Sequence, residues 1–291
     1  MTLEGALRLA DILSGSGIGE IDIMGGEPTL LAWMPDFLEA VSKKGMSLNL
    51  STNGGNTDMV LRLAELDPGR VHIGVSLEGS TAEEHERLTF SHNFRAAVDS
   101  IAGLVALKCD PVVKTVVSKE TVRFIPQIVD LIRNIGVKRY YLIHMDIIGR
   151  DRRLAEYALS YTSFRAFYEE IRQNNPDIGI FKVNASCFNK EALPEGVRCA
   201  GGVNKLSVMP DGSVYPCNLF HRIGGFNLGN ILRQDLLKIW QDPRLDLFRD
   251  IDPGSCHVVS CSNRPSCTGG CPAHGYFFHE KPDGPDIRCL S

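Results

Sequence analysis

The sequence predicts an α/β fold for residues 1–180, followed by an irregular, cysteine-rich domain over residues 185–291. Two observations carry this prediction. In the first part, stretches with the apolar spacing of helices alternate with short strand-like stretches, which is typical of βαβ units on one parallel sheet. In the second part, which is rich in Gly and Pro, lie eight of the nine cysteines.

Five stretches are predicted to form the strands of the sheet, and most of them are rich in Val, Ile or Tyr. They are Glu20–Met24, Ser47–Ser51, Val71–Ser76, Pro111–Val117 and Arg139–Met145. Apolar residues at helical spacing predict the helices before, between and after them. Their ranges are 3–14, 30–44, 57–66, 94–107, 122–135 and 163–174.

Charge and hydropathy exclude several classes of partner. The formal net charge of −4 gives no electrostatic reason to expect nucleic acid or an anionic membrane as partner. No stretch has the apolar length of a membrane span. The first residues include Glu4 and Arg8 and lack the basic start of a signal peptide. We therefore expect a cytoplasmic protein without a nucleic-acid or membrane partner.

The position of the cysteines indicates metal ligation. A disulfide-rich secreted module is short and follows an export signal, whereas these cysteines follow a long α/β segment. Their own segment shows only a hairpin signal around Lys205–Tyr215 and a helix around 233–241. It has too few apolar runs for a conventional core, so metal sites are expected to hold it together. Zinc bound by four thiolates is the competing metal.

Three consecutive predicted strands end in glycine and polar residues. The segments are Met24-Gly25-Gly26-Glu27-Pro28, Ser51-Thr52-Asn53-Gly54 and Ser76-Leu77-Glu78-Gly79. The carboxyl ends of parallel barrel strands are where ligands bind, so these segments are expected on one rim. The first segment alone also fits an ordinary connection with a solvated Glu27. The series of three favours a ligand site.

Together these segments resemble the radical S-adenosylmethionine family, whose second strand ends in Gly-Gly-Glu-Pro. The stretch Glu84-His85-Glu86-Arg87 is similar to the segment after the fourth strand of that family. The resemblance implies that the amino group of S-adenosylmethionine binds here through a charge-assisted hydrogen bond. The residues that receive this group are Gly25, Gly26 and Glu27, while Ser51, Asn53 and Ser76 line the carboxylate and ribose side.

The resemblance implies a partial (β/α)6 barrel that lacks its first strand. In this family a Cys-x3-Cys-x2-Cys loop after that strand holds a third, catalytic [4Fe–4S] cluster, and this sequence begins at the helix that follows. Both the first strand and the whole cysteine loop are missing, whereas mutation of the motif would leave an altered loop in place. This favours a shortened sequence over a motif lost by mutation. Without the three thiolates no electron reaches the sulfonium, so we expect this chain alone to be inactive and a full-length relative to be active. The strand Glu20–Met24 is then an uncovered edge.

The cysteine spacing closely resembles the SPASM domain, which binds two auxiliary [4Fe–4S] clusters. The spacing is Cys199-x12-Gly212-x4-Cys217, then Cys256-x4-Cys261-x5-Cys267-x3-Cys271, then Cys289; the four-residue gap after Cys256 departs from the usual two. By the interleaved pattern of the family, the first cluster takes Cys187, Cys199, Cys217 and Cys271, and the second takes Cys256, Cys261, Cys267 and Cys289. A buried free thiol is the alternative for Cys187 and the expectation for Cys109.

The resemblance implies that an intact form modifies a ribosomally made peptide or a protein through a 5′-deoxyadenosyl radical. Its partners are this substrate and a reductant such as ferredoxin or flavodoxin. A non-catalytic iron–sulfur protein, serving as electron carrier or peptide-binding partner, is the alternative. In sulfatase-maturing relatives an Asp follows the cysteine that corresponds to Cys217, and here Asn218 cannot act as that base. The alternative is that Asn218 is a turn residue without a chemical role. His144 and Asp146 either face the substrate or are structural, and for His144 the structural role is favoured.

Overall fold

The computed structural model describes residues 1–149, 153–183, 199–249, 270–282 and 284–289. These residues form two compact units, which are described separately. The larger unit comprises residues 2–143 and 165–183. The second unit comprises residues 144–164 and the described residues from 184 onward, so the segment that follows the fifth strand belongs to the C-terminal unit.

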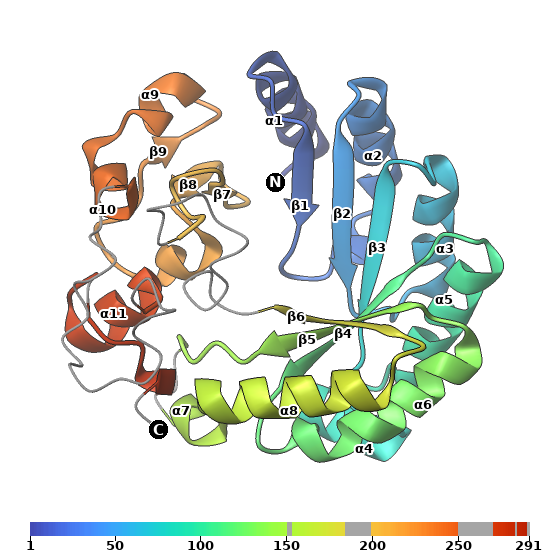
Figure 1. Ribbon diagram of the computed structural model, residues 1–291. Coiled ribbons are helices and arrows are strands. Elements are labelled where there is room, and N and C mark those ends of the chain that lie inside the picture. Colours follow the sequence, from blue (N-terminus) through green and yellow to red (C-terminus); the bar gives the residue numbers. More distant parts are fainter. Residues whose placement is uncertain (150–152, 184–198, 250–269, 283, 290–291) are drawn as a thin grey trace. The chain divides into compact units, whose positions relative to one another are not determined.

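The larger unit is built on a six-stranded sheet in the sequential order β1-β2-β3-β4-β5-β6 (Figure 1). The strands are β1 (Glu20–Ile23), β2 (Ser47–Thr52), β3 (Val71–Ser76), β4 (Val112–Val117), β5 (Arg139–His144) and β6 (Gly179–Val183). The pairs β1–β2, β2–β3, β3–β4 and β5–β6 are parallel. Sequential parallel strands separated by helices are the topology of a (β/α) barrel. The predicted α/β fold with a partial barrel is therefore confirmed, and β1 forms an edge of the sheet as expected.

The sixth strand, β6, has no counterpart among the strands predicted from the sequence. It pairs with β5 from Arg139↔Gly179 to Ile143↔Val183. Its five residues include a single fully buried side chain, Ile180, while Phe181 is 46% exposed. Such a short edge strand leaves almost no apolar periodicity in the sequence, so pattern analysis misses it.

All six predicted helices are present, and the structure adds a seventh, α4. The helices of this part of the chain are α1 (Leu3–Gly15), α2 (Met34–Lys43), α3 (Thr57–Leu66), α4 (Ala82–Thr89), α5 (Phe94–Ala106), α6 (Ile125–Ile135) and α8 (Tyr161–Asn174). A short 3-10 helix, η1 (Pro28–Leu30), precedes α2, and another, η2 (Thr121–Phe124), precedes α6. Helix α4 begins with a capping box, in which Thr81 and Glu84 bond each other's backbone N–H groups.

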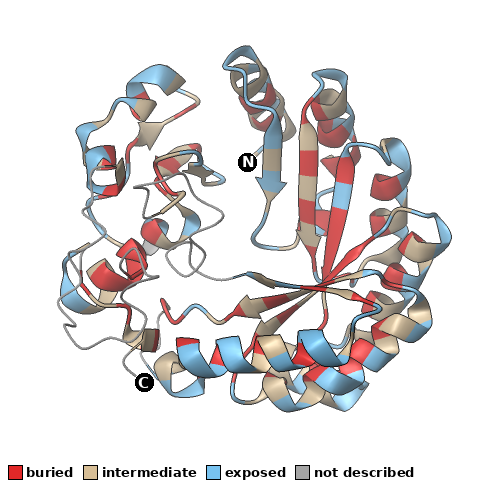
Figure 2. Ribbon diagram, in the orientation of Figure 1, coloured by how far each residue is buried: buried red, intermediate tan, exposed pale blue. Residues whose placement is uncertain are grey.

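The two faces of the sheet differ in burial, which Figure 2 shows as alternating buried and half-buried residues along β2. Along β2 and β5, side chains alternate strictly between buried and half-buried positions. The buried face packs against helices such as α2 and α3, and each fully buried aliphatic side chain there contributes about 1.5–3 kcal/mol. The opposite face is polar over much of its area, because it carries Asn49, Ser51, Ser76, Lys114 and Tyr141. This polar face is where a hydrophilic ligand can be held.

The second unit contains a small antiparallel sheet, β7 (Ser207–Val208), β8 (Ser213–Tyr215) and β9 (Gly229–Asn230). The β7–β8 pair is the predicted hairpin, closed by a 2.8 Å bond from the Gly212 N–H to the Met209 carbonyl. Short helices complete the unit: α7 (Leu154–Tyr157), η5 (Asn218–Arg222), α9 (Leu236–Trp240), η6 (Pro243–Leu245), α10 (Asp246–Arg249), α11 (Pro272–His279) and η8 (Ile287–Cys289). Helix α9 confirms the predicted helix around 233–241.

The expectation that this unit lacks an apolar core is wrong. Four aromatic side chains from separate segments meet in its interior: Phe220, Phe226, Phe248 and Tyr276. The ring centroids of Phe220 lie 4.5 Å from Phe226 and 5.0 Å from Phe248. Because the four residues come from segments far apart in the sequence, no single apolar run predicts the cluster. Such contacts add about 0.5–1.5 kcal/mol per pair beyond burial.

Candidate functional site

The turn after β1 requires two glycines for its backbone conformation. Gly25 has a φ of +83° and Gly26 a φ of +55°. A Cβ atom at either position would meet nothing within 4 Å. The left-handed backbone, rather than crowding, therefore explains the glycines. The same open space leaves the backbone groups of the turn accessible to a ligand.

The carboxylate of Glu27 is held in place by the ends of the first two strands. Its Oε1 accepts hydrogen bonds from the Thr29 N–H at 3.1 Å and from the hydroxyls of Thr29 and Thr52, both at 2.7 Å. Its Oε2 accepts one from the Asn53 N–H at 2.7 Å. A carboxylate offers about four acceptor positions, two on each oxygen, so Oε2 can accept a further donor. A ligand ammonium group fits this acceptor.

Ser51, Asn53 and Ser76 lie at the carboxyl ends of the next two strands. Ser51 pairs with Gly74, and Ser76 lies two residues further along β3, so both serines are on the polar face of the sheet. Asn53 follows β2, and its side-chain oxygen accepts a 2.8 Å bond from the Gly55 N–H. The structure thus places all six predicted cofactor residues at the same rim. Their contacts with a cofactor stay a prediction.

Lys114 is a member of this rim that the sequence analysis missed. Its Nζ donates a 2.7 Å hydrogen bond to Ser51 Oγ, and its backbone pairs with Ser76. The side chain crosses Gly74, where any Cβ atom would overlap it. Burial lowers the pKa of Lys114, while the charge of Asp22 opposes that shift. The sequence signal that could have identified it is a lysine within the otherwise valine-rich strand Val112–Val117. The ammonium group of Lys114 can bind an anionic group such as a carboxylate.

Glu78 continues the β3–β4 pairing with its side chain. Its Oε2 accepts a 3.0 Å bond from the Val116 N–H, just beyond the last backbone bond from the Leu77 N–H to the Lys114 carbonyl at 2.9 Å. Burial of the carboxyl group raises the pKa of Glu78 to about 8. The sequence analysis placed Glu78 in the polar strand end without assigning it a role. A carboxyl group with this pKa is expected to be largely protonated near neutral pH.

The raised pKa of Glu78 predicts a pH-dependent stability. In an unfolded chain a Glu has a pKa of about 4.3, so the folded protein binds the extra proton between pH 4.3 and 8. The contribution of Glu78 to stability is complete below about pH 4.3 and is lost as the pH rises through 8. Glu78→Gln keeps a neutral acceptor, so we expect a higher melting temperature than wild type at pH 9 and equality at pH 4. A change of 1 kcal/mol in the free energy of unfolding shifts the melting temperature by about 2–4 °C.

Thermal denaturation followed by circular dichroism between pH 4 and pH 9 measures this difference. The exposed Glu83→Gln variant is the matched control, and its difference from wild type should stay constant with pH. Parallel curves for Glu78→Gln and wild type would contradict the assignment.

His85 and Asn93 connect the ends of β2 and β3. His85 Nδ1 accepts a 3.0 Å bond from the Glu78 N–H, so its Nε2 carries the proton and donates to Asn93 Oδ1 at 3.2 Å. The Asn93 amide in turn donates to the Asn53 carbonyl at 2.8 Å. Burial lowers the pKa of His85, which keeps the ring neutral. The segment Glu84–Arg87, noted in the sequence, therefore supplies a residue that fixes the geometry of the rim.

In the second unit, three of the predicted cysteine ligands lie close together. The Gly201 N–H donates to Cys199 Sγ at 3.4 Å, and a Cβ atom built on Gly201 would lie 3.4 Å from Cys217 Cβ. Burial, reinforced by the neighbouring Cys199 thiol, raises the pKa of Cys217 to about 11. Burial, then Asp286 and Cys199, raise the pKa of Cys271 further. Cys271 is buried, and Cys199 and Cys217 are half-buried. Neighbouring thiols become thiolates only with a positive group among them, so the chemistry of these donors is compatible with an iron–sulfur cluster.

The remaining cysteines divide into two groups. Cys289 ends η8, and Cys109 is a half-buried free thiol whose pKa is raised by burial. Cys187, Cys256, Cys261 and Cys267 lie outside the described residues, so their predicted ligand roles stay predictions. Within the described part of the chain, no group of three or more His, Cys, Asp or Glu side chains is arranged around a single metal ion.

His144 and Asp146, at the end of β5 and just after it, make different contacts. His144 is only 1% exposed, stacks on Phe164 with ring centroids 4.5 Å apart, and places Nε2 3.0 Å from the Leu159 carbonyl. This is the geometry of a structural residue. Asp146 instead accepts a 3.0 Å bond from Arg288.

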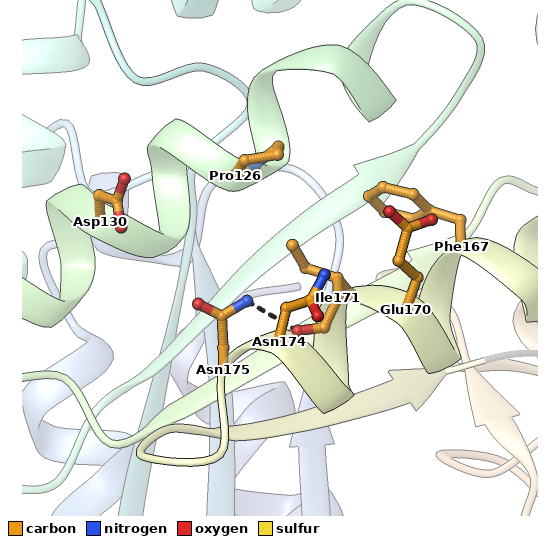
Figure 3. Close-up of a pocket in the computed structure, with 7 residues that line it drawn as sticks. All are labelled: Pro126, Asp130, Phe167, Glu170, Ile171, Asn174 and Asn175. Carbon is orange, nitrogen blue, oxygen red and sulfur yellow. Dashed lines mark hydrogen bonds between the residues drawn. The ribbon is translucent and has the colours of Figure 1, made fainter.

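A pocket of about 280 Å³ lies between α6 and α8, away from the carboxyl ends of the strands (Figure 3). Its lining residues are Pro126, Asp130, Phe167, Glu170, Ile171, Asn174 and Asn175. A 2.7 Å bond from the Asn175 amide to the Ile171 carbonyl closes one end. The pocket contains none of the predicted site residues.

Two family models match the chain. The Radical SAM superfamily model, named for S-adenosylmethionine, matches residues 1–132, and the SPASM model, an iron–sulfur cluster-binding domain, matches residues 199–272. Together they cover more than two thirds of the chain. No helix in the described residues is both long enough and apolar enough to span a bilayer.

Comparison with known proteins points in the same direction. The chain is 24% identical to PqqA peptide cyclase of Methylorubrum extorquens (strain PA1), over 91% of this chain and 70% of that protein. It is 28% identical to mycofactocin maturase MftC of Mycobacterium ulcerans (strain Agy99), over 97% and 78%. The crystal structure of Streptococcus suis SuiB bound to S-adenosylmethionine shares the fold, with a TM-score of 0.80 at 16% identity over 100% of this chain and 71% of SuiB. SuiB has also been solved with its precursor peptide SuiA.

Proposed function

Because the chain belongs to the radical S-adenosylmethionine superfamily and carries a SPASM iron–sulfur domain, we propose that it is the core of an enzyme that modifies a ribosomally made peptide. The observation that carries this proposal is the rim of polar residues around Glu27. The rim lies at the carboxyl ends of parallel strands, and the second unit contains neighbouring cysteines, of which Cys271 is buried. The names PqqA peptide cyclase and mycofactocin maturase, and the SuiB complex with a precursor peptide, support a peptide as the substrate.

The residues of the rim bind and orient S-adenosylmethionine in this proposal. Glu27 Oε2 accepts a hydrogen bond from the ammonium group, and Lys114 Nζ, which already bonds Ser51, pairs with the carboxylate. Asn53 and Ser76 complete the polar lining. When a catalytic cluster is bound by a Cys-x3-Cys-x2-Cys segment, it supplies the electron that cleaves the cofactor to a 5′-deoxyadenosyl radical.

The second unit holds two auxiliary [4Fe–4S] clusters through the eight cysteines from Cys187 to Cys289. Of these, Cys199, Cys217 and Cys271 already lie together in the described residues. A low-potential electron carrier such as ferredoxin or flavodoxin serves as reductant, and the protein acts in the cytoplasm. Substrate oxidation in such an enzyme releases an electron that an auxiliary cluster can accept.

Asn218 directs the proposal toward peptide crosslinking rather than formylglycine formation. It follows Cys217 at the start of η5, and its backbone carbonyl lies 2.5 Å from His221 Nδ1. A side-chain amide nitrogen is not basic, so Asn218 cannot remove a proton from a sulfatase Cys or Ser.

The proposal is tested with the chain extended by a segment that carries Cys-x3-Cys-x2-Cys. We expect this enzyme to remove two hydrogen atoms from a short peptide encoded next to its gene, as thioether or carbon–carbon crosslinking does, and to leave a sulfatase-motif peptide unchanged. Mass spectrometry of both peptides after anaerobic incubation measures this. Efficient formylglycine formation in the sulfatase peptide, with the encoded peptide unmodified, would overturn the assignment.

A further inference from the structure

A buried arginine lies beside the cysteine ligands of the second unit. Arg288 is 2% exposed. Its Nε and Nη2 donate to the two oxygens of Asp286 at 2.9 and 2.8 Å, which makes the pair bidentate. Its Nη1 donates to the Asp146 carboxylate at 3.0 Å and to the Met145 carbonyl at 3.2 Å. Removing such a charge from water is costly, so the surrounding fold must hold the pair in a defined position.

Asp286 contacts the backbone of two cysteines. Its carboxylate Oδ2 accepts a 3.3 Å bond from the Cys271 N–H, and its main-chain carbonyl accepts a 2.8 Å bond from the Cys289 N–H. A Cβ atom on Gly270 would lie 2.5 Å from the Asp286 backbone nitrogen. The backbone just before Cys271 is therefore packed directly against Asp286. One residue therefore fixes the backbone of both cysteines.

We propose that the Asp286–Arg288 ion pair positions the two auxiliary clusters together and sets the reduction potential of the cluster that Cys271 binds. This inference rests on the proposed function, in which Cys271 and Cys289 belong to different clusters. Asp286 holds one ligand of each cluster, and Arg288 holds Asp286. Second-sphere groups of this kind orient ligands and tune the metal centre.

The charges around Cys271 give the direction of the effect on the potential. Asp286 Oδ2 accepts a 3.3 Å bond from the Cys271 N–H, and Arg288 bonds both Asp286 and Asp146, so one cation and two carboxylates lie beside this ligand. Reduction adds a negative charge to a cluster, so a nearby cation raises the reduction potential and a nearby carboxylate lowers it. Removal of Arg288 should lower the potential, and removal of Asp146 should raise it.

The same unit contains a matched ion pair far from any cysteine in sequence. Asp242 and Arg244 have the same i, i+2 spacing and the same bidentate geometry, with Nε–Oδ1 at 2.8 Å and Nη2–Oδ2 at 2.6 Å. Arg244 also bonds the carbonyls of Gly225 and Asn227, so it too has a structural role. Substitutions in this pair control for the loss of an arginine–aspartate contact as such.

The experiment compares the reconstituted 291-residue protein with its Asp286→Asn, Arg288→Gln and Arg288→Lys variants, and with Asp242→Asn and Arg244→Gln as controls. Iron and sulfide are counted, and EPR-monitored redox titration gives the midpoint potential of each cluster. We expect Asp286→Asn to reduce the iron content from about eight toward four or fewer and to change the signals of both clusters. We expect Arg288→Gln to lower the potential of one cluster by at least about 59 mV, a tenfold change in a one-electron equilibrium.

Arg288→Lys retains the positive charge and should restore most of that potential, which a purely structural role would not explain. If Arg288→Gln does not fold, Asp146→Asn decides the question, because its partly exposed side chain tolerates the change and the potential should rise. Wild-type iron content and potentials in the Asp286, Arg288 and Asp146 variants, as in the controls, would overturn the inference alone. Wild-type protein that binds no cluster would overturn both the inference and the proposed function.

Discussion

Replacing Cys271 by alanine is expected to remove about four of the about eight iron atoms that the reconstituted protein binds. Cys271 is buried, and its thiol lies within electrostatic range of Cys199. Loss of one of the four thiolates leaves one iron of the cubane without a protein ligand, in a site where burial raises the pKa of the Cys217 thiol. That cluster should not survive anaerobic purification.

The Cys109→Ala variant is the matched control for this experiment. Cys109 is a free thiol in the turn after α5, in the other unit of the chain, and its removal should leave the iron content unchanged. Cys199→Ala and Cys217→Ala should repeat the loss caused by Cys271→Ala, because the proposed assignment gives these three thiols to one cluster. Iron, labile sulfide and zinc are measured together on each protein. Stoichiometric zinc without labile sulfide would show that the unit is a zinc domain.

The fold was predictable where the sequence is periodic. Strand β2 (Ser47–Thr52) and helix α3 (Thr57–Leu66) lie almost where the pattern of apolar residues predicts them, because each buries one regular face. Helix α4 has a low apolar content and is defined by its capping box, a signal of two residues that periodicity does not detect. Strand β6 is short and lies at an edge, so its sequence carries almost no pattern.

The candidate site was predictable where chemistry requires a particular residue type. Gly25 and Gly26 have positive φ angles, and Glu27 bonds four donors, so these identities are fixed by local geometry. Lys114 could not be placed from sequence alone, because its role depends on the register that sets it opposite Ser76 and across Gly74.

The Asp286–Arg288 pair could not be recognised from the sequence either, because its role also depends on the fold. Its two residues resemble any surface ion pair, like Asp242 and Arg244, until the fold buries them beside Cys271. Distances between segments remote in sequence are set by packing, and packing is what single-sequence patterns do not encode.

The 291-residue polypeptide, reduced with dithionite and given S-adenosylmethionine, is expected to form no 5′-deoxyadenosine above background. Residues 1–186 contain only Cys109, so no Cys-x3-Cys-x2-Cys motif is available to bind a catalytic cluster beside Glu27. In the proposed function, the eight cysteines from Cys187 to Cys289 bind the two auxiliary clusters, so none is left to bind a catalytic one. Joining a segment with the three-cysteine motif to Met1 should start 5′-deoxyadenosine formation, measured by liquid chromatography. Robust product from the unextended chain would show that the catalytic cluster is bound elsewhere.

In the extended, active chain, Glu27→Gln is expected to raise the KM for S-adenosylmethionine by about 10–100-fold, because a charge-assisted hydrogen bond is worth about 1.5–3 kcal/mol. The amide keeps one oxygen and sets its N–H₂ group either against the Thr29 and Thr52 donors now at Oε1 or against the Asn53 N–H now at Oε2. Glu20→Gln is the matched control: Glu20 is an exposed carboxylate at the start of β1, the strand that precedes Glu27, and it is bonded to Asn49 at 2.9 Å. Its loss should leave KM unchanged. If both variants behave alike, Glu27 serves only to cap η1, and the ammonium group of the cofactor binds elsewhere on the rim.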